Sequence, residues 1–324
     1  MISKNFDNIL ITGASGNSAY FFLKKLEKEN FRKVITIITR SKSKNSYFKK
    51  FNLNFKILNG DINDKKFLLK SLSNIDTILH TANIENSENI IKVGNEKKVK
   101  WFILVHSTMV FSKNSSPRIK NRIRIEKEIL KKNSNITILS STMIYGTPRD
   151  INMSRLIKFM DKFKIFPIFG NGKNYMQPIY IEDLANAYYE VIKLKDKTFN
   201  KRYILAGKKP IKYIDILRLI EKKLNKKIYF IKIPLSLSLF FIKICEIIFF
   251  GKLHINTSQV KRLSEDKIYD YSDAEKDFLF KPKTFEEGIE IQIKNYKDTK
   301  SSIEINKEWL LKLITWLLVL DHLD

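Results

Sequence analysis

The chain has 324 residues, of which 44% are hydrophobic and 29% are charged, so it is long enough for one large globular domain or two unequal ones. Sixty lysine and arginine residues against 34 acidic ones give a formal net charge of +26, which would ordinarily indicate a nucleic-acid or membrane-surface partner. The lysines are spread almost evenly, and no zinc-ligand spacing, RNA-binding sheet motif or basic heptad helix accompanies them, so we expect no nucleic-acid partner.

The single cysteine, Cys245, excludes an internal disulfide and a cysteine-rich metal site, and we expect no metal. No charged-then-apolar leader is visible, so the expected location is cytoplasmic. The longest apolar stretch, Leu235–Phe250, contains two charged residues and is shorter than the roughly 20 residues that span a bilayer.

An apolar run that ends in a glycine-containing turn lies near the start of the chain, with the sequence ILITGASGNSA over residues 9–19. Gly13 and Gly16 allow a tight turn and a close approach to a pyrophosphate, which N–H groups at the start of a following helix would hold. The pattern predicts a dinucleotide-binding turn; the alternative is a chance strand-turn-helix. The expected contacts come from Thr12, Gly13, Ser15, Gly16 and Asn17.

A β-branched run over residues 34–39 predicts a buried parallel strand that ends in Arg40-Ser41-Lys42-Ser43-Lys44. Folds that select NAD place an acid near this strand end for the ribose 2′-hydroxyl, whereas a basic residue accommodates a 2′-phosphate. No acid is present and Arg40 is placed to face the adenosine ribose, so we expect NADP in preference to NAD. The alternative is that these charges belong to a solvated loop.

Two further strands are expected at residues 55–58 and 75–79, with helices at 64–72 and 86–98. The strands end in Gly60-Asp61-Ile62 and His80-Thr81-Ala82. Ligands of a doubly wound sheet bind at such carboxyl ends, where Asp61 and Ile62 would lie by the adenine and Ala82 would leave room for the cofactor. His80 is more often a packed histidine than a catalytic one.

A fifth strand, 101–106, runs into Ser107-Thr108-Met109-Val110-Phe111. The order TGxxGxxA, GDI, HTA and a strand ending in Ser-Thr resembles the short-chain dehydrogenase/reductase superfamily in its extended nucleotide-sugar epimerase/dehydratase branch. Four downstream segments also resemble that family, so the resemblance covers roughly residues 8–292. They are TMIYG at 142–146, QPIYIEDLA at 177–185, TSQV at 257–260 and FEEGI at 285–289.

The resemblance implies a doubly wound, Rossmann-type α/β sheet with a smaller substrate domain after it. We expect a dinucleotide-binding domain over residues 1–165, with later segments returning to it, and a substrate domain over 166–294. An extra helix is expected within 295–324. The sixth strand of the sheet is expected to close at residues 142–146.

The chemistry of that family needs a serine or threonine at the substrate oxygen, a tyrosine as general acid and base, and a lysine four residues later. Ser107 or Thr108 fills the first role. Residues 112–144 contain no tyrosine. Glu126 lies where the family often has a glutamate in this helix. Counting back from it puts Arg118 at the tyrosine position and Arg122 at the lysine position. Arg122 could bind ribose hydroxyls, but arginine does not transfer protons near neutral pH.

Ser140-Ser141 is a second departure, since many relatives carry Arg-Pro there. Tyr145 is the one tyrosine near the strand ends. It is either a substitute general acid or a ring packed under the substrate loop.

The second half of the chain is expected to shape a substrate cleft. Resemblance suggests that an amphipathic helix over 152–163 and the loop 170–174 border it. Arg149, Arg155 and Lys173 could contact a diphosphate or be solvated. The apolar stretch Leu235–Phe250 is either a packed helix of the substrate domain or a peripheral membrane contact. The stretch Trp309–Leu320 is an extra packing helix, a homodimer contact or a peripheral membrane contact.

The first hypothesis is an NADP- or NAD-dependent epimerase, dehydratase or reductase acting on a nucleotide sugar, which the resemblance places in surface-polysaccharide synthesis. The second is a dinucleotide-binding regulator or assembly subunit that has lost turnover, because the tyrosine is missing. The third is a peripheral membrane protein.

Overall fold

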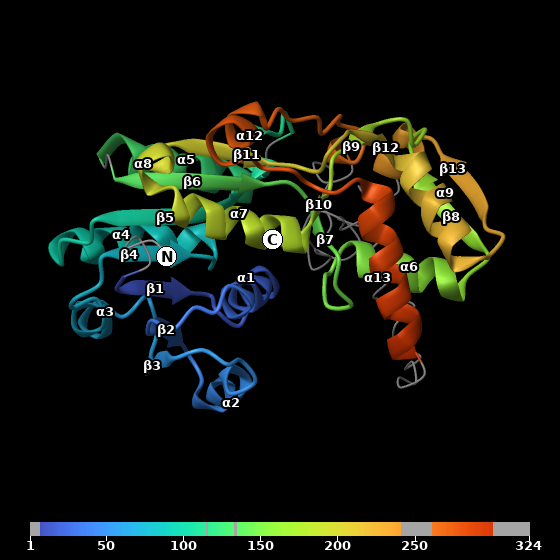
Figure 1. Ribbon diagram of the computed structural model, residues 1–324. Coiled ribbons are helices and arrows are strands. Elements are labelled where there is room, and N and C mark those ends of the chain that lie inside the picture. Colours follow the sequence, from blue (N-terminus) through green and yellow to red (C-terminus); the bar gives the residue numbers. More distant parts are fainter. Residues whose placement is uncertain (1–6, 115, 133–134, 241–260, 301–324) are drawn as a thin grey trace.

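A parallel sheet of seven strands forms the centre of the computed structural model, which describes residues 7–114, 116–132, 135–240 and 261–300 (Figure 1). The strand order is β11-β6-β5-β4-β1-β2-β3, and all neighbours are parallel. The prediction of a doubly wound α/β sheet is confirmed. The strands are β1 (Ile9–Thr12), β2 (Ile35–Thr39), β3 (Phe55–Asn59), β4 (Thr77–His80), β5 (Trp101–Ser107), β6 (Ile136–Ser141) and β11 (Arg202–Leu205).

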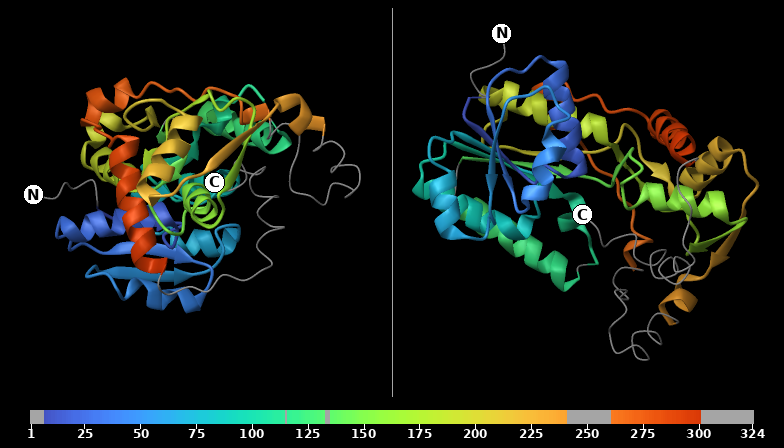
Figure 2. Two further views of the ribbon diagram at one scale, coloured as in Figure 1. Left: turned by 90° about the vertical axis from the view of Figure 1, so that its right-hand side faces the viewer. Right: turned by 90° about the horizontal axis from the view of Figure 1, so that it is seen from below.

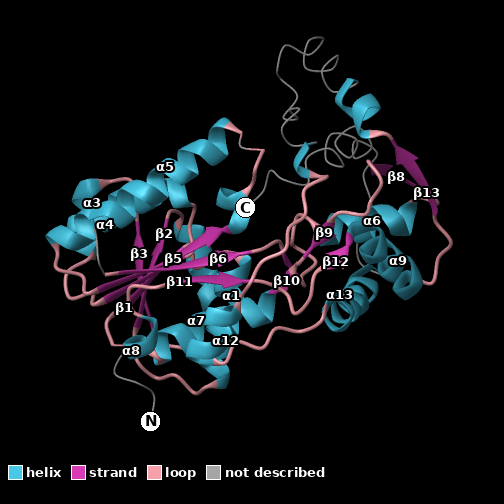
Figure 3. Cartoon of the chain, turned by 90° about the horizontal axis from the view of Figure 1, so that it is seen from above, coloured by secondary structure: helices cyan, strands magenta, loops and turns pink. Residues whose placement is uncertain are grey.

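Helices cover both faces of this sheet, because alternate residues of each buried strand point to opposite sides. In β1, Ile9 and Ile11 pack in one core cluster, whereas Leu10 packs in another. The first cluster lies under α1 (Asn17–Lys28), α2 (Asn45–Phe48), α7 (Ile181–Lys193) and α12 (Ser272–Phe278), with α8 (Lys195–Thr198) after α7. The second lies under α3 (Lys65–Ser71), α4 (Ser87–Glu96) and α5 (Pro117–Lys132) (Figure 3).

Segments late in the chain return to the sheet: β11 pairs with β6, and α7 packs against α1. Between and after them, the chain builds a smaller lobe with its own core (Figure 2). The domain boundaries at 165 and 294 stay a prediction. The lobe contains α6 (Met153–Lys162), α9 (Tyr213–Leu224), α13 (Phe285–Lys300), and the strand pairs β7 (Ile144–Tyr145) with β10 (Ile179–Tyr180), β8 (Ile165–Phe169) with β13 (Tyr229–Ile233), and β9 (Tyr175–Met176) with β12 (Ile211–Lys212).

The sixth strand ends earlier than expected. It stops at Ser141. The Thr142 N–H still donates to the Leu205 carbonyl of β11 at 3.0 Å, while the Thr142 hydroxyl donates to the Gln177 carbonyl at 2.7 Å. The chain then forms β7, which pairs with β10 rather than continuing β6. This bend carries the chain from the sheet into the smaller lobe.

Parts of the expected apolar segments lie outside the described residues. Residues 235–240 are helical, and 241–250, which include Cys245, lie outside, as do 257–260 and Trp309–Leu320. Among the helices that the structure does describe, none has the length and apolar character needed to cross a membrane.

Candidate functional site

The turn after β1 has a backbone geometry that requires glycine. Gly13 has a φ of +70°, and a Cβ added to it would lie 2.8 Å from the Ala82 nitrogen and 2.8 Å from Thr81 Oγ1. The Gly16 N–H donates to the Gly13 carbonyl at 2.8 Å, and Gly16 is the N-cap of α1. No side chain caps this helix end and no acid lies in its first turn. The positive end of α1 therefore faces the turn without a competing carboxylate.

Thr12 lies beneath the turn rather than at its surface. Its hydroxyl is 2.7 Å from His80 Nδ1 in a fully buried contact, and its carbonyl accepts from the Thr81 hydroxyl at 2.8 Å. Burial lowers the pKa of His80 to about 4, so its ring is neutral near pH 7. Thr12 and His80 thus join the ends of β1 and β4 and hold the turn in place.

A cleft of about 530 Å³ follows the carboxyl ends of β1, β2, β3 and β4. It brings together most of the expected cofactor residues: Gly13, Ser15, Gly16, Arg40, Asp61, Ile62 and Ala82. Lys44 also lines it, and its ammonium donates to the Ser15 hydroxyl at 3.4 Å. One Asp61 carboxylate oxygen accepts from the Asn63 N–H at 2.8 Å, which shapes the loop after β3.

Two further cavities continue this cleft. One of about 290 Å³ shares Gly16 and Ala82 with it and also contains Asn17, Ser107 and Arg122. The next, of about 80 Å³, shares Ser107 with the second and enters the smaller lobe. The three cavities adjoin one another along the sheet edge, and we refer to this row of cavities as the path; Ser107 and Asn152 line both of the last two.

Ser107 and Thr108 lie at the end of β5, where the chain enters a 3-10 turn over Thr108–Phe111. The Ser107 hydroxyl accepts from the Met109 N–H at 3.3 Å, which orients it at the mouth of the third cavity. Thr108 lines the same cavity, and its carbonyl accepts from the Tyr269 hydroxyl at 3.5 Å. Both expected substrate-polarising residues therefore border the path.

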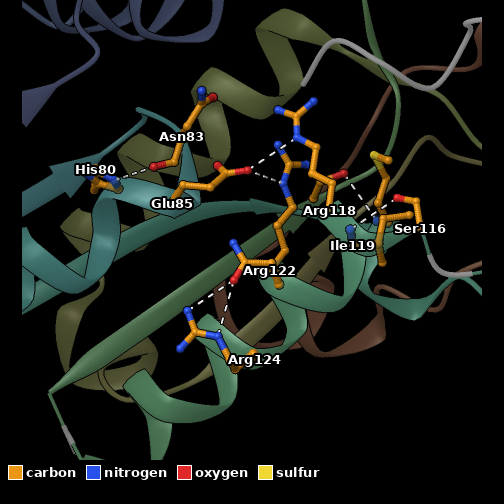
Figure 4. Close-up of polar contacts among 11 residues, drawn as sticks. His80, Asn83, Glu85, Ser116, Arg118, Ile119, Arg122 and Arg124 are labelled. Carbon is orange, nitrogen blue, oxygen red and sulfur yellow. Dashed lines mark hydrogen bonds and ion pairs between the residues drawn. The ribbon is translucent and has the colours of Figure 1, made fainter. Parts of the chain in front are cut away.

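Arginines occupy the α5 positions where the resemblance places a tyrosine and a lysine. Arg118 Nε lies 3.4 Å and Arg122 Nε 3.1 Å from the same oxygen, Oε1 of Glu85, which belongs to the 3-10 turn Ile84–Asn86 after β4 (Figure 4). The Arg122 side chain is 5% exposed and that of Arg118 is 42% exposed. Burial acts to raise the pKa of Glu85, but a backbone hydrogen bond and the two arginines outweigh it, so the pKa lies below its ordinary value.

Tyr145 packs inside the smaller lobe and is not among the residues that line the three cavities. Its hydroxyl donates to the Phe285 carbonyl at 3.4 Å, and its ring contacts those of Tyr180 and Phe285. Burial raises its pKa. The structure therefore places the Tyr145 ring in the core of the smaller lobe. Tyr213 and Tyr269 line the third cavity instead.

A buried polar group beside the path was not expected from the sequence. His106 Nδ1 lies 2.8 Å from Glu126 Oε2, and Arg202 of β11 forms an ion pair with the other oxygen of Glu126. Burial, followed by the charges of Arg202 and Arg122, lowers the pKa of His106 to about 3. The neutral ring thus donates its Nδ1–H to Glu126.

Ser140 lies beside His106 in the register of β5 and β6. Arg202, which pairs with Glu126, lies on β11, the strand next to β6. The sequence showed both Ser140 and Arg202, but only the sheet order brings Arg202 to Glu126.

The third cavity combines cationic and apolar side chains. Arg262, 2% exposed, lines it with Lys267, and an Arg262 guanidinium N–H donates to the Asn114 carbonyl at 3.3 Å. Glu265 accepts from the Ser112 hydroxyl and the Asn114 N–H, both at 2.8 Å. The apolar lining comes from Met143, Pro167, Phe169, Met176, Tyr213 and Tyr269.

The three expected diphosphate contacts separate in the structure. Arg149 lines the second cavity, and Lys173 lines a different, open hollow near Pro234. Arg155 is not among the residues that line the three cavities of the path. Arg262 could not be identified beforehand, because no local pattern around it distinguishes it from the other cations of a lysine-rich chain.

A family model described as the NmrA-like family matches residues 5–287. A search of curated proteins finds no significant match. Among solved structures, a UDP-glucuronic acid 4-epimerase from Bacillus cereus in complex with UDP-glucuronic acid and NAD superposes with a TM-score of 0.70 at 20% identity, covering 90% of this chain and 99% of that one.

Two further epimerase structures are similar. A UDP-glucose 4-epimerase from Thermotoga maritima with UDP-glucose has a TM-score of 0.66 at 16% identity, covering 90% of this chain and 99% of that one. A UDP-glucose 4-epimerase from Bifidobacterium longum in complex with NAD+ and UDP has a TM-score of 0.66 at 15% identity, covering 90% and 98%. At these identities the likeness shows the fold.

Proposed function

Because this chain belongs to the NmrA-like family, we propose that it binds a nicotinamide dinucleotide along the sheet edge and acts as an epimerase- or reductase-like enzyme on a nucleotide sugar. The observation that carries the proposal is the row of three adjoining cavities from the Gly13 turn, past Ser107, to the cavity that Arg262 lines. Its first two parts would hold a dinucleotide and its third part a second ligand.

The turn after β1 fits the pyrophosphate of the dinucleotide. A Cβ at Gly13 would fill the space beside Ala82, and the uncapped start of α1 offers N–H groups to an anion. A nicotinamide dinucleotide supplies the hydride acceptor or donor. The chain's own groups would bind and orient it: Asp61 and Ile62 near the adenine, and Asn17 and Arg122 in the second cavity.

Arg40 supports NADP in preference to NAD. Arg40 and Lys44 line the first cavity at the end of β2, and residues 40–44 contain no acid that would hold a ribose 2′-hydroxyl. A guanidinium makes charge-assisted hydrogen bonds with a phosphate, so the 2′-phosphate would bind there.

The lining of the third cavity, about 80 Å³ in volume, suits part of a nucleotide sugar. Arg262 and Lys267, beside the acid Glu265, suit the charges of a diphosphate, while Met143, Met176 and Tyr213 offer apolar surface to a base or sugar ring. Three solved structures of similar fold are epimerases of UDP-sugars, which supports this class. We extend the proposal to surface-polysaccharide synthesis on the resemblance described above.

Ser107 would donate a hydrogen bond to the substrate oxygen, and Thr108 would border it. The proton partner must differ from that of the family pattern, because Arg118 does not exchange protons near pH 7 and Tyr145 is buried elsewhere.

The arginine pair favours a second candidate function. Arg118 and Arg122 both pair with Glu85 in place of a tyrosine and a lysine, which suits a protein that binds the dinucleotide without turnover. Such a protein would serve as a regulator or an assembly subunit.

Cofactor content and affinity test the first part of the proposal. The purified chain is denatured to identify any released nucleotide, and the stripped chain is titrated with NADPH and NADH by fluorescence. We expect Arg40→Ala to weaken NADPH about tenfold and to leave NADH unchanged. Arg32→Ala, an exposed arginine before β2, is the control. No binding of either dinucleotide would overturn the proposal.

Turnover separates the two candidate functions. The chain loaded with oxidised or reduced dinucleotide is mixed with UDP-glucose or UDP-glucuronic acid, and absorbance of the reduced cofactor and the sugar products are followed. A cofactor signal or an epimerised sugar supports the enzyme. Tight dinucleotide binding with neither supports the regulator or assembly subunit.

A further inference from the structure

The outer side of the smaller lobe exposes a group of large apolar side chains. Ile165 of β8 and Tyr229 and Ile231 of β13 are 54%, 57% and 51% exposed, and Leu237 and Phe240 just after β13 are 44% and 60% exposed. We refer to Ile165, Tyr229 and Ile231, which belong to the paired strands, as the β13 surface. In Figure 1, β8 and β13 lie at the right-hand end of the molecule, away from the seven-stranded sheet.

The pairing of β8 with β13 places three of these side chains on one face. Tyr229 pairs with Ile165, and Ile231 pairs with Pro167, in a parallel register. The alternate residue of β8, Phe166, is fully buried in the core of the lobe. A solvent-facing side of a strand pair ordinarily carries polar residues, so an apolar outer face indicates a docking surface.

Lysines outnumber acids in the segments that flank the β13 surface. Residues 158–169 and 221–233 together contain eight lysines and two acids, Asp161 and Glu221, and one of these lysines, Lys223, pairs with Glu290. The Asp161 side chain is only 9% exposed and is already bonded to Lys226. Lys164 and Lys227 are exposed next to Ile165 and Tyr229, and the Lys227 ammonium lies 5.8 Å from the Tyr229 ring centre. The surface thus has an apolar centre and a cationic rim.

We propose that the β13 surface docks on an anionic lipid bilayer, with its three apolar side chains in the interface and the lysines on lipid phosphates. Apolar insertion and attraction of lysines to anionic lipids act together in such contacts. A second copy of the chain is the weaker alternative, since a symmetric contact would bring the two lysine rims together and like charges repel.

The docked orientation leaves the dinucleotide cleft free. No residue of the β13 surface lines the three cavities of the path. The inference therefore stands independently of the proposed function.

Flotation of the full chain tests the proposal. The chain is mixed with vesicles of phosphatidylcholine alone or of phosphatidylcholine and phosphatidylglycerol in equal amounts, and its floating fraction is measured in a density gradient at low and high salt. We expect flotation with the anionic vesicles only, and less at high salt. Ile231→Glu should lower the partition coefficient about tenfold. The double variant Lys164→Ser, Lys227→Ser should lower the partition coefficient by about fivefold for each lysine that is replaced.

Matched variants keep the test specific. Val34→Glu changes an equally exposed side chain, 54%, on the other lobe, and Lys66→Ser with Lys70→Ser changes two lysines of α3; both should float like the original chain. Circular dichroism and dinucleotide binding verify folding. Equal flotation of the Ile231→Glu and Val34→Glu chains would overturn the proposal, as would no flotation at all. If the chain does not float but self-associates, and Ile231→Glu converts it to a monomer, then the β13 surface binds a second copy of the chain instead.

Discussion

Arg122 and Glu85 form an ion pair of 3.1 Å beside the cavity that Ser107 borders. The Arg122 side chain is 5% exposed, whereas that of Glu85 is 31% exposed. The pair links α5 to the turn after β4, and Arg118 adds a second contact to the same carboxylate oxygen. This link therefore joins a helix and a turn that both border the second cavity through side chains of opposite charge.

Glu85→Ala should destabilise the fold by about 1 to 3 kcal/mol, because it leaves the buried Arg122 guanidinium without this carboxylate. Urea denaturation measures the free energy of unfolding. Glu96→Ala, which removes the partner of Lys65 in an exposed pair of 3.0 Å, should change it by less than about 0.5 kcal/mol. Equal effects of the two substitutions would contradict a structural role for the Glu85 contact.

Gly13→Ala should abolish most dinucleotide binding, with an affinity at least roughly tenfold lower, because its Cβ would lie 2.8 Å from the Ala82 nitrogen at a φ of +70°. Fluorescence titration with NADPH measures the affinity. Gly170→Ala is the matched control, since Gly170 has a φ of +82° but open space where the Cβ would lie. Backbone strain is common to both variants, so only Gly13→Ala should lose the ligand; retained affinity would contradict the assignment of the turn.

The fold was predictable because its signals are local. The glycine turn and the apolar runs that end in Arg40, Asp61 and Ser107 are short stretches whose periodicity and end residues identify parallel strands. These strand ends meet at one edge of any doubly wound sheet, so it could be predicted that most of the expected cofactor residues line one cleft.

The contacts of the site were less predictable because they join distant segments. Glu85 is 37 residues from Arg122 along the chain. Glu126 forms its ion pair with Arg202, which lies on β11, the last strand of the sheet in chain order. Tyr145 was a plausible acid by its position after β6, but the bend at Thr142 directs it into the smaller lobe. The hydrophobic periodicity of the sequence does not indicate such a change in the direction of the chain.

Arg202→Ala should destabilise the chain by about 2 kcal/mol, because Glu126, whose side chain is 7% exposed, would keep only the neutral His106 as partner. The Arg202 side chain is 36% exposed, which moderates the loss. Arg202→Lys should recover part of it. As a control, Arg124→Ala removes an exposed arginine that pairs with Glu88 at 3.5 Å and should have little effect. Urea curves with equal midpoints for Arg202→Ala and Arg124→Ala would contradict the assigned pairing.

His80 should make stability fall on mild acidification. Burial lowers its pKa from 6.5 to about 4 in the folded chain, so the unfolded chain binds more protons between these values. The stabilisation is complete above about pH 6.5 and decreases as the pH falls toward 4, by roughly 3 kcal/mol for a group this deeply buried.

Urea denaturation at a series of pH values measures this dependence, with His80→Asn as the test variant. The asparagine amide still offers a polar atom near the Thr12 hydroxyl but does not titrate. The slope of the free energy of unfolding against pH should therefore decrease between pH 6.5 and 4. His106, whose pKa is also lowered by burial, keeps part of the slope in the variant. An unchanged slope would show that His80 is not the buried neutral group that joins β1 to β4.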